Sequence, residues 1–314
     1  MLEVDGLTKY FSAGLIRKRH VKAVDGISFR VEKGKTLGLV GESGCGKTTI
    51  GRLIMRLIEP TGGRVLFDNI DLLSLKKSEL RKIRPRMQMI FQDPDSSLDP
   101  RMTIGTSIAE PLKVHGAVPK YERSHKIREL IETVGLSPEH VNRYPYQLSG
   151  GQNQRVVLAR ILAMNPDLII ADEPTSSLDV SVQAQILNLM KDLQKTFNHT
   201  YLFISHDLDV VRIMADQIAV MYLGRLVEIG ETRDVFDCAK HPYTQALLSA
   251  AIRLKPGAEG KKRTLLKGDT PSAIDVPSGC RFHTRCPRKE ERCMVEEPEL
   301  VEIGGGHRVA CHFI

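Results

Sequence analysis

A glycine-rich run followed by a lysine and a threonine could bind the phosphates of a nucleotide. It reads Gly41-Glu42-Ser43-Gly44-Cys45-Gly46-Lys47-Thr48 and matches the pattern G-x-x-x-x-G-K-[ST]. Its glycines let backbone N–H groups surround phosphate oxygens, and the helix that follows directs its positive end at them. We expect Lys47 to neutralise the β- and γ-phosphates and the Thr48 hydroxyl to ligate Mg²⁺. The expected nucleotide contacts in this run are Gly41, Ser43, Gly44, Cys45, Gly46, Lys47, Thr48 and Thr49.

Two acids at the end of an apolar run could serve the same chemistry. Asp172 and Glu173 directly follow Leu168-Ile169-Ile170-Ala171. Buried strands of α/β sheets bring ligand-binding residues to their carboxyl ends. We expect Asp172 to hold Mg²⁺ through water and Glu173 to polarise the attacking water. Together with the glycine-rich run, this pair predicts hydrolysis of a nucleoside triphosphate.

A third run, Leu148-Ser149-Gly150-Gly151-Gln152, lies between these two in the sequence. A serine hydroxyl, backbone N–H groups and a helix N-terminus would suit an anion.

The elements around the first run are those of a strand–loop–helix unit, because Thr36 to Val40 is apolar and enters the glycine-rich turn. Apolar residues then recur at helical spacing until Pro60, which should end the helix; they are Ile50, Leu53, Ile54, Leu57 and Ile58.

Strands and helices alternate along much of the chain. Ile27, Phe29 and Val31 alternate with polar neighbours, which predicts a half-buried strand. Further expected elements are strands at 87–91, 168–171 and 201–204 and a helix at 182–197. Between about 93 and 163 no strand signal appears, and apolar residues at helical spacing (127, 130, 131 and 134) predict a helical insertion. The fold class is therefore α/β, with a parallel sheet covered on both faces.

Composition narrows the class of protein. Of the 314 residues, 41% are hydrophobic, which suffices for a core and argues against wholesale disorder. Residues 1–10 carry acids and no apolar segment typical of a signal peptide, and no apolar run approaches the roughly 18 residues of a membrane span. We expect a cytosolic chain. The net charge is +7, but the basic clusters are short and lack interleaved aromatic residues, so we expect no nucleic-acid partner.

Four of the six cysteines crowd the last 35 residues; they are Cys280, Cys286, Cys293 and Cys311. In a cytosolic chain such a cluster indicates metal binding more readily than disulfides. Four thiolates suit Zn²⁺ or an iron–sulfur cluster, and the spacing matches neither the usual zinc pairing nor the common ferredoxin pattern. The spacing therefore leaves the metal open, and the nearby histidines could substitute as zinc ligands; they are His283, His307 and His312.

The order of these motifs resembles that of ABC transporter ATPase subunits. The resemblance implies that Ser149, Gly150, Gly151 and Gln152 form the signature, which contacts the γ-phosphate of ATP held by the other protomer. It also implies a Q-loop glutamine at Gln92, a D-loop aspartate at Asp179 and a switch histidine at His206. The implied catalytic residues are Glu173, His206 and Gln92, and the implied Mg²⁺ ligands are Thr48, Gln92 and Asp172. Phe11 falls where an aromatic residue usually stacks on adenine, with Tyr10 as its rival.

Two stretches and the cysteine tail resemble oligopeptide and dipeptide importers in particular. Residues 91–102 are similar to the Q-loop region of the F-type subunit, and residues 241–248 are a further hallmark of these importers. The resemblance implies two different ATPase subunits that pair beneath two membrane permeases, with a separate extracytoplasmic substrate-binding protein. It places the chain at the cytoplasmic face of the membrane, and it favours a [4Fe–4S] cluster over zinc at the four cysteines.

The expected fold is a P-loop NTPase of the ABC cassette type with an antiparallel β subdomain, a helical subdomain and a cysteine-rich C-terminal extension. The expected division is a nucleotide-binding core at 1–92 and 163–238, a helical subdomain at 93–162 and the extension at 239–314. The expected function is ATP hydrolysis that drives solute import, with di- and oligopeptides as the expected solutes, through ATP-dependent dimerisation. The alternative is an ABC ATPase that acts on nucleic acid and carries a zinc module.

Overall fold

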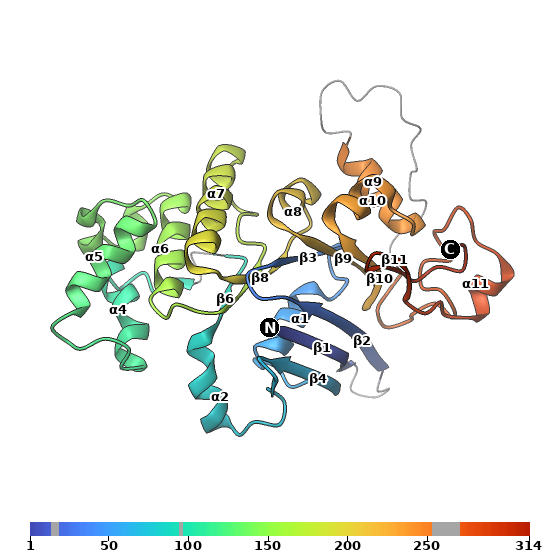
Figure 1. The fold of residues 1–314 in the computed structure, drawn as a ribbon, viewed down its shortest axis with the longest axis horizontal. Helices are drawn as coiled ribbons and strands as arrows, with labels where there is room; N and C mark the ends of the chain where they lie inside the picture. Colours follow the sequence, from blue (N-terminus) through green and yellow to red (C-terminus); the bar gives the residue numbers. More distant parts are fainter. Residues whose placement is uncertain (14–18, 94–96, 253–270) are drawn as a thin grey trace. The chain divides into compact units, whose positions relative to one another are not determined.

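The computed structural model describes residues 1–13, 19–93, 97–252 and 271–314. The chain folds into two compact units: residues 1–74 with 203–314, and residues 75–202. Strands and helices occur in both (Figure 1). Within the described ranges, no helix is both long enough and apolar enough to cross a membrane. Residues 94–96, which belong to the predicted Q-loop region, lie outside the described residues.

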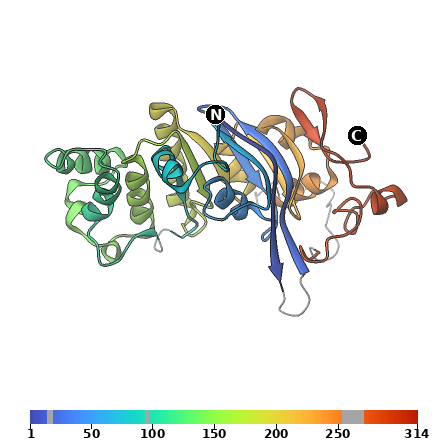
Figure 2. The ribbon, with the colours of Figure 1, turned by 90° about the horizontal axis from the view of Figure 1, so that it is seen from below.

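The first unit begins with an antiparallel four-stranded sheet in the order β2-β1-β4-β5. The strands are β1 (Leu2–Ala13), β2 (Arg19–Val31), β4 (Gly62–Phe67) and β5 (Ile70–Asp71). β1 and β2 run side by side as a long ribbon, drawn in blue in Figure 2, with Leu2 opposite Val31. Ile27, Phe29 and Val31 are buried. Their alternation with polar residues therefore predicted this strand correctly.

The first unit also contributes five strands to a mixed sheet, in the order β11-β12-β10-β9-β3. These strands are β3 (Thr36–Val40), β9 (Gln217–Tyr222), β10 (Arg225–Glu231), β11 (Val301–Gly304) and β12 (His307–Val309). β3 is parallel to β9, whereas β10 is antiparallel to both β9 and β12. The helices of this unit are α1 (Lys47–Ile54), α8 (Leu208–Met214), α9 (Thr232–Cys238), α10 (Pro242–Ile252) and α11 (Glu291–Val295).

The helix after the glycine-rich turn is shorter than predicted. The apolar spacing predicted a helix as far as Ile58, but α1 ends at Ile54. Arg56 adopts a left-handed φ of 49°, which turns the chain out of the helix before Pro60 is reached. Its guanidinium donates to the Leu72 carbonyl at 3.1 Å and so holds the turn in place.

The second unit has strands in the order β8-β7-β6. They are β6 (Met87–Ile90), β7 (Leu168–Asp172) and β8 (Thr200–Ile204), and the last two residues of β8 count with the first unit. β6 and β7 are parallel, with Met87 opposite Leu168. The long helix α7 (Val180–Phe197) connects β7 to β8. The three strands predicted in this part of the sequence are confirmed.

Between β6 and β7, the described residues form helices and no strand, as predicted. The α-helices are α4 (Ile104–Val114), α5 (Arg123–Thr133) and α6 (Gly150–Leu162), and α2 (Lys77–Ile83) precedes β6. Short 3-10 turns link them: η1 (Arg84–Arg86), η2 (Pro138–Asn142) and η3 (Pro145–Gln147). The predicted helical stripe is buried, since Ile131 and Val134 are fully covered. These helices therefore share a core of their own.

Candidate nucleotide-binding site

The glycine-rich run forms the loop between β3 and α1. Gly41, Gly44 and Gly46 all have positive φ, and Gly46 is the N-cap of α1. A Cβ atom at Gly41 would lie 2.2 Å from the Met221 carbonyl oxygen, and one at Gly46 would lie 2.1 Å from the carbonyl oxygen of Ala23. Both positions therefore need glycine, because an added side chain would collide with backbone and not with a movable side chain.

Lys47 is the charged group of this loop. Its side chain is buried, and its ammonium donates to the carbonyl oxygens of Gly41 at 2.8 Å and Glu42 at 3.0 Å. Neighbouring Cys45 is also buried, and burial raises the pKa of its thiol. The neutral thiol lies 3.8 Å from the Lys47 ammonium, which brings a positive charge to the loop. This is the arrangement that a phosphate chain requires.

The two acids follow β7 as the sequence predicted. Asp172 is the last residue of the strand and is buried, and Glu173 comes directly after it with a left-handed φ of 48°. Gln92 lies just beyond the end of the parallel strand β6, and its side-chain amide donates to Glu173 Oε2 at 3.0 Å. The ends of two parallel strands thus bring Gln92 and Glu173 together in the second unit.

The run at Leu148 to Gln152 starts helix α6. Ser149 is the N-cap: its hydroxyl accepts from the Gln152 N–H at 3.3 Å, and the Gln152 side-chain oxygen accepts from the Ser149 N–H at 3.0 Å. Ser149 and Gly150 are exposed, whereas Gly151 is buried. A Cβ atom at Gly151 would lie 2.3 Å from Val182 Cγ1, so this glycine lets α6 pack closely against α7. The run therefore has a local structural role besides the one predicted for it.

Asp179 and His206 are held by turns at the starts of helices. Asp179 is the N-cap of α7, and its carboxylate accepts from the Val182 N–H at 2.9 Å. His206 is exposed in the turn between β8 and α8. The backbone on its N-terminal side is fixed by a hydrogen bond from the Ser205 N–H to the Leu39 carbonyl at 3.2 Å, and Asp207 caps α8 on the other side. Both side chains thus sit on short, well-anchored turns.

Tyr10 and Phe11 are neighbours on β1 and therefore point to opposite faces of the sheet. The Tyr10 hydroxyl donates a hydrogen bond to Asp25, which together with burial raises the pKa of Tyr10. The Phe11 ring is 39% exposed, with the Lys9 ammonium 5.0 Å from its centroid. The Tyr10 hydroxyl is thus hydrogen-bonded inside the unit, whereas the Phe11 ring lies partly exposed at its surface.

The predicted site residues divide between the two units. The first unit carries Phe11, the loop from Gly41 to Thr49, and His206, and the second carries Gln92, Ser149 to Gln152, Asp172, Glu173 and Asp179. Sequence reasoning missed three contacts inside the first unit, which Glu42 makes with Lys47, Tyr243 and Arg285. No local pattern could have indicated the contact with Arg285, because the two residues are far apart in the sequence.

The predicted iron–sulfur cluster is wrong. Within the described parts of the chain, which include all four cysteines of the tail, no group of three or more His, Cys, Asp or Glu side chains is placed to hold a metal ion. Burial raises the pKa of Cys280 to about 11 and also raises the pKa values of Cys286 and Cys311. The neutral thiol is thereby favoured at these three cysteines in the metal-free chain.

No such group of the described side chains is placed to hold zinc either. The histidines named as possible ligands have other contacts. His307 Nε2 lies 2.8 Å from Glu228 Oε1, His312 Nε2 lies 3.0 Å from the Glu296 carbonyl oxygen, and His283 Nδ1 lies 2.8 Å from the Cys280 carbonyl oxygen. The tail therefore folds through hydrogen bonds and apolar packing.

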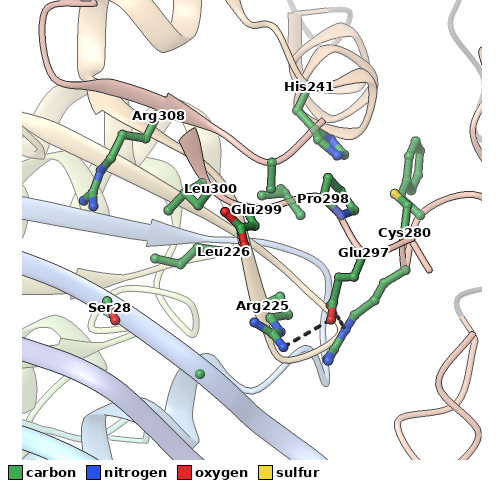
Figure 3. A pocket seen from close by; sticks show the side chains of 15 residues that line it. Ser28, Arg225, Leu226, His241, Cys280, Glu297, Pro298, Glu299, Leu300 and Arg308 are labelled. Carbon is green, nitrogen blue, oxygen red and sulfur yellow. Dashed lines mark hydrogen bonds and ion pairs between the residues drawn. The ribbon is translucent and has the colours of Figure 1, made fainter. Parts of the chain in front are cut away.

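A cavity of about 490 Å³ lies in the first unit between β10 and the C-terminal segment. Arg225 and Arg281 both donate to the Glu297 carboxylate on its wall, at 3.2 Å and 3.1 Å (Figure 3). Arg281 is buried and also pairs with Asp25 of β2. No residue predicted to bind nucleotide lines this cavity. Its charged residues instead tie the C-terminal segment to β2 and β10.

The fold is that of an ABC cassette. A solved dimeric ABC cassette bound to ADP and phosphate is similar with a TM-score of 0.66 and 32% identity, covering 74% of this chain and 99% of that one. CbiO1 from Clostridium perfringens, part of the ABC transporter complex cbiONQ, is similar with a TM-score of 0.67 and 26% identity, covering 81% of this chain and 95% of that one. The predicted P-loop NTPase fold with mixed α/β sheets is confirmed.

Sequence comparison narrows the class to one family. Residues 24–176 match the ABC transporter family, and residues 227–293 match the C-terminal region of oligopeptide/dipeptide transporters. The oligopeptide transport ATP-binding protein AppF of Bacillus subtilis is 50% identical over 99% of this chain and 97% of its own length. A putative peptide import ATP-binding protein of Brucella ovis is 49% identical over 99% and 97%. The chain belongs to the ATP-binding subunits of oligopeptide/dipeptide ABC transporters, as predicted, and is an ABC-type ATPase.

Proposed function

We propose that this chain hydrolyses ATP to drive the import of di- or oligopeptides through an ABC transporter. The observation that carries the proposal is that both the cassette and the C-terminal region match the peptide-transporter family. An intact phosphate-binding loop and an acidic pair after β7 support catalytic competence. The proposed reaction is attack of water on the γ-phosphorus, which releases ADP and inorganic phosphate.

ATP would lie with its phosphates against the loop from Gly41 to Thr49. The loop fits such a ligand, because Lys47 brings a buried ammonium to it and the positions of Gly41 and Gly46 have no room for a Cβ atom. Thr48, Gln92 and Asp172 would hold Mg²⁺, which would supply neutralisation of the phosphate charge when bound. Phe11, the exposed aromatic residue of β1, is proposed to stack on adenine.

Glu173 would accept a hydrogen bond from the attacking water and take its proton as the P–O bond forms. Its hydrogen bond from Gln92 orients the carboxylate, so we assign Gln92 a part in placing the base as well as in sensing the γ-phosphate. His206 would donate a hydrogen bond to the γ-phosphate from its exposed turn.

The exposed N-terminus of α6 would serve a second ATPase subunit. Ser149, Gly150, Gly151 and Gln152 would contact the γ-phosphate of ATP bound by that subunit, and Asp179 would cross to it. We propose that this subunit is non-identical, and that two membrane permeases and an extracytoplasmic substrate-binding protein complete the transporter. The chain would then act at the cytoplasmic face of the membrane, and we propose no nucleic-acid partner.

We propose the functional division that the sequence predicts, whose boundaries differ from those of the two compact units. Residues 1–92 and 163–238 would bind nucleotide, residues 93–162 would form the helical subdomain that meets a permease, and residues 239–314 would form the cysteine-rich extension. The helical character of the described residues between β6 and β7 supports this division.

Uptake by the reconstituted transporter tests the proposal. The chain is purified together with the products of neighbouring permease and ATPase genes, placed in liposomes with ATP inside, and supplied with labelled di- and oligopeptides and their binding protein. We expect uptake that requires ATP and is lost in Glu173→Gln. Hydrolysis that is stimulated by DNA and needs no permease would instead favour an ABC ATPase that acts on nucleic acid.

A further inference from the structure

Glu42, the second residue of the phosphate-binding loop, forms an ion pair with an arginine of the C-terminal segment. Arg285 Nη1 lies 2.8 Å from Glu42 Oε2, and Arg285 Nη2 lies 3.1 Å from Glu42 Oε1. The pair is therefore bidentate. The Arg285 side chain is only 8% exposed and that of Glu42 only 24%, so water screens the two charges little.

A second side chain from the C-terminal half holds the backbone of the same residue. The Glu42 N–H donates to the Tyr243 hydroxyl at 2.9 Å, and Tyr243 is fully buried in α10. Burial raises the pKa of Tyr243, so its hydroxyl stays neutral. The Glu42 carbonyl meanwhile accepts from the Lys47 ammonium at 3.0 Å. The N–H, the carboxylate and the carbonyl of Glu42 are thus each held by a different side chain.

An aromatic cluster places Tyr243 and Arg285. Phe282 is 1% exposed, with its ring centroid 5.3 Å from that of Tyr222 and 5.4 Å from that of Tyr243. Phe282 lies in the same turn as Arg285, whose N–H donates to the Phe282 carbonyl at 3.0 Å. The Tyr222 hydroxyl accepts from Arg285 Nη1 at 3.4 Å. The buried Phe282 ring thereby fixes the turn that carries Arg285, and with it the position of the guanidinium beside Glu42.

From these contacts we infer that Arg285 and Tyr243 are positioning residues for ATP binding, through which the C-terminal segment holds the phosphate-binding loop in shape. This inference rests on the proposed role of the loop in binding ATP. A carboxylate at Glu42 without its guanidinium would be a negative charge in the loop that takes the phosphates, and would repel them. Arg285 removes that repulsion, and Tyr243 fixes the peptide that precedes the Glu42 side chain.

A double-mutant cycle on ATP affinity tests the inference. Dissociation constants for Mg-ATP are measured by fluorescence with the full chain as wild type, Arg285→Met, Glu42→Gln and the double variant. We expect Arg285→Met to weaken ATP binding about tenfold in the wild-type background and less than about twofold in the Glu42→Gln background, because no charge is then left to neutralise. Equal effects in the two backgrounds, or no effect in either, would overturn the inference.

A matched control lies in the same C-terminal segment. Arg292 forms an equivalent pair with Glu296, at 2.7 Å and 3.0 Å, on an exposed surface of α11. Arg292→Met should leave ATP affinity unchanged. Arg285→Lys keeps the charge without the bidentate geometry and should lie between wild type and Arg285→Met.

Two further variants distinguish failure of the positioning role from failure of the proposed ATP-binding site. Tyr243→Phe keeps the aromatic cluster and removes only the hydroxyl, so reduced ATP affinity is expected even if Arg285→Met does not fold. Lys47→Ala tests the loop itself. Loss of ATP binding in Lys47→Ala with unchanged affinity in a folded Arg285→Met and in Tyr243→Phe would refute the positioning role alone. Undiminished ATP binding in Lys47→Ala would refute the proposed site.

Discussion

At the scale of the residue, Glu173 combines an unfavourable backbone with a favourable side-chain contact. Its φ of 48° lies in the left-handed region, which costs a residue with a side chain about 1 kcal/mol or more. Its carboxylate meanwhile accepts a hydrogen bond from Gln92 at 3.0 Å. Such backbone conformations are kept where the surrounding structure imposes them, often at functional sites. The backbone of Glu173 and its hydrogen bond from Gln92 together orient the Glu173 carboxylate.

The first prediction concerns this carboxylate. Glu173→Gln should lower the rate of ATP hydrolysis at least about 100-fold, because an amide cannot take the proton of the attacking water. ATP affinity should change little, since the phosphate-binding loop is untouched. Steady-state hydrolysis and equilibrium binding of ATP measure the two effects. Glu129→Gln, which changes an exposed acid of α5, is the control, and unimpaired hydrolysis in Glu173→Gln would contradict the assigned base.

At the scale of the element, the close packing of α6 against α7 depends on one glycine. A Cβ atom at Gly151 would approach Val182 Cγ1 to 2.3 Å, whereas one at neighbouring Gly150 would lie 3.4 Å from Leu178 Cδ2. Val182 is β-branched and lies in the first turn of α7, so it has few ways to move aside. The two adjacent glycines of the proposed signature therefore have different structural roles.

The second prediction compares alanine at these two positions. Gly151→Ala should lower the free energy of unfolding by about 1–3 kcal/mol, because the methyl group overpacks the contact with α7. Gly150→Ala should leave it unchanged or raise it by up to about 1 kcal/mol, because alanine favours a helix more than glycine does. Denaturant unfolding measures both. Equal stability of the two variants would show that α6 and α7 can separate without cost.

The strand β2 carries a charged residue whose pairing makes stability depend on pH. Burial alone would raise the pKa of Asp25, but hydrogen bonds from Tyr10 and Arg281 and the charges of Arg281 and Arg225 lower it below its usual value. A carboxyl group with a lowered pKa stabilises the folded state above the pKa of the unfolded chain. That contribution disappears as pH falls through the lower pKa of the folded state.

The third prediction follows from this shift. Asp25→Asn should lower the free energy of unfolding at pH 7, where wild-type Asp25 is ionised and paired. The difference between the two proteins should shrink as pH falls below about 4, the pKa of an unfolded aspartate. Urea unfolding at several pH values measures this difference, and Asp5→Asn, at an exposed position of β1, is the control. A difference that grows toward acid pH would contradict the sign of the shift.

At the scale of the whole molecule, the chain belongs to a family that works as an assembly. The proposed signature is an exposed helix N-terminus, and no residue predicted to bind the chain's own ATP belongs to it. Under the proposed function, the signature completes the site of the second ATPase subunit. In this proposal, one chain carries a complete phosphate-binding loop for its own ATP and the signature that contacts the ATP of its partner.

The fourth prediction separates these two roles. Gly150→Asp puts a negative charge at an exposed helix N-terminus, where it suits the helix but repels a phosphate. ATP affinity of the isolated chain should be unchanged, whereas ATP hydrolysis by the assembled transporter should fall at least about tenfold. Gly150→Ala is the matched control. Full hydrolysis by the assembled Gly150→Asp variant would show that the run does not face a partner's ATP.

Much of the fold could be predicted from the sequence because the signals are local. Alternating apolar residues predicted β2, and apolar runs predicted β3, β7 and β8 within a residue or two. The end of α1 could not be predicted in this way. It depends on the left-handed turn at Arg56, which is held by a carbonyl brought close by a later strand. The prediction of a metal at the cysteines was wrong for a similar reason, because spacing along the chain does not show where the side chains lie in the fold.

The sequence by itself determined the chemistry of the phosphate-binding loop, because eight consecutive residues contain the glycines, the lysine and the threonine that the chemistry needs. It also determined the family, through motifs that each occupy a few neighbouring residues. Only the tertiary structure decided that Arg285 and Tyr243 hold Glu42, and that the cysteine-rich tail packs through Phe282. These contacts join residues far apart in the chain, and the burial and charge that make them strong exist only once the chain has folded.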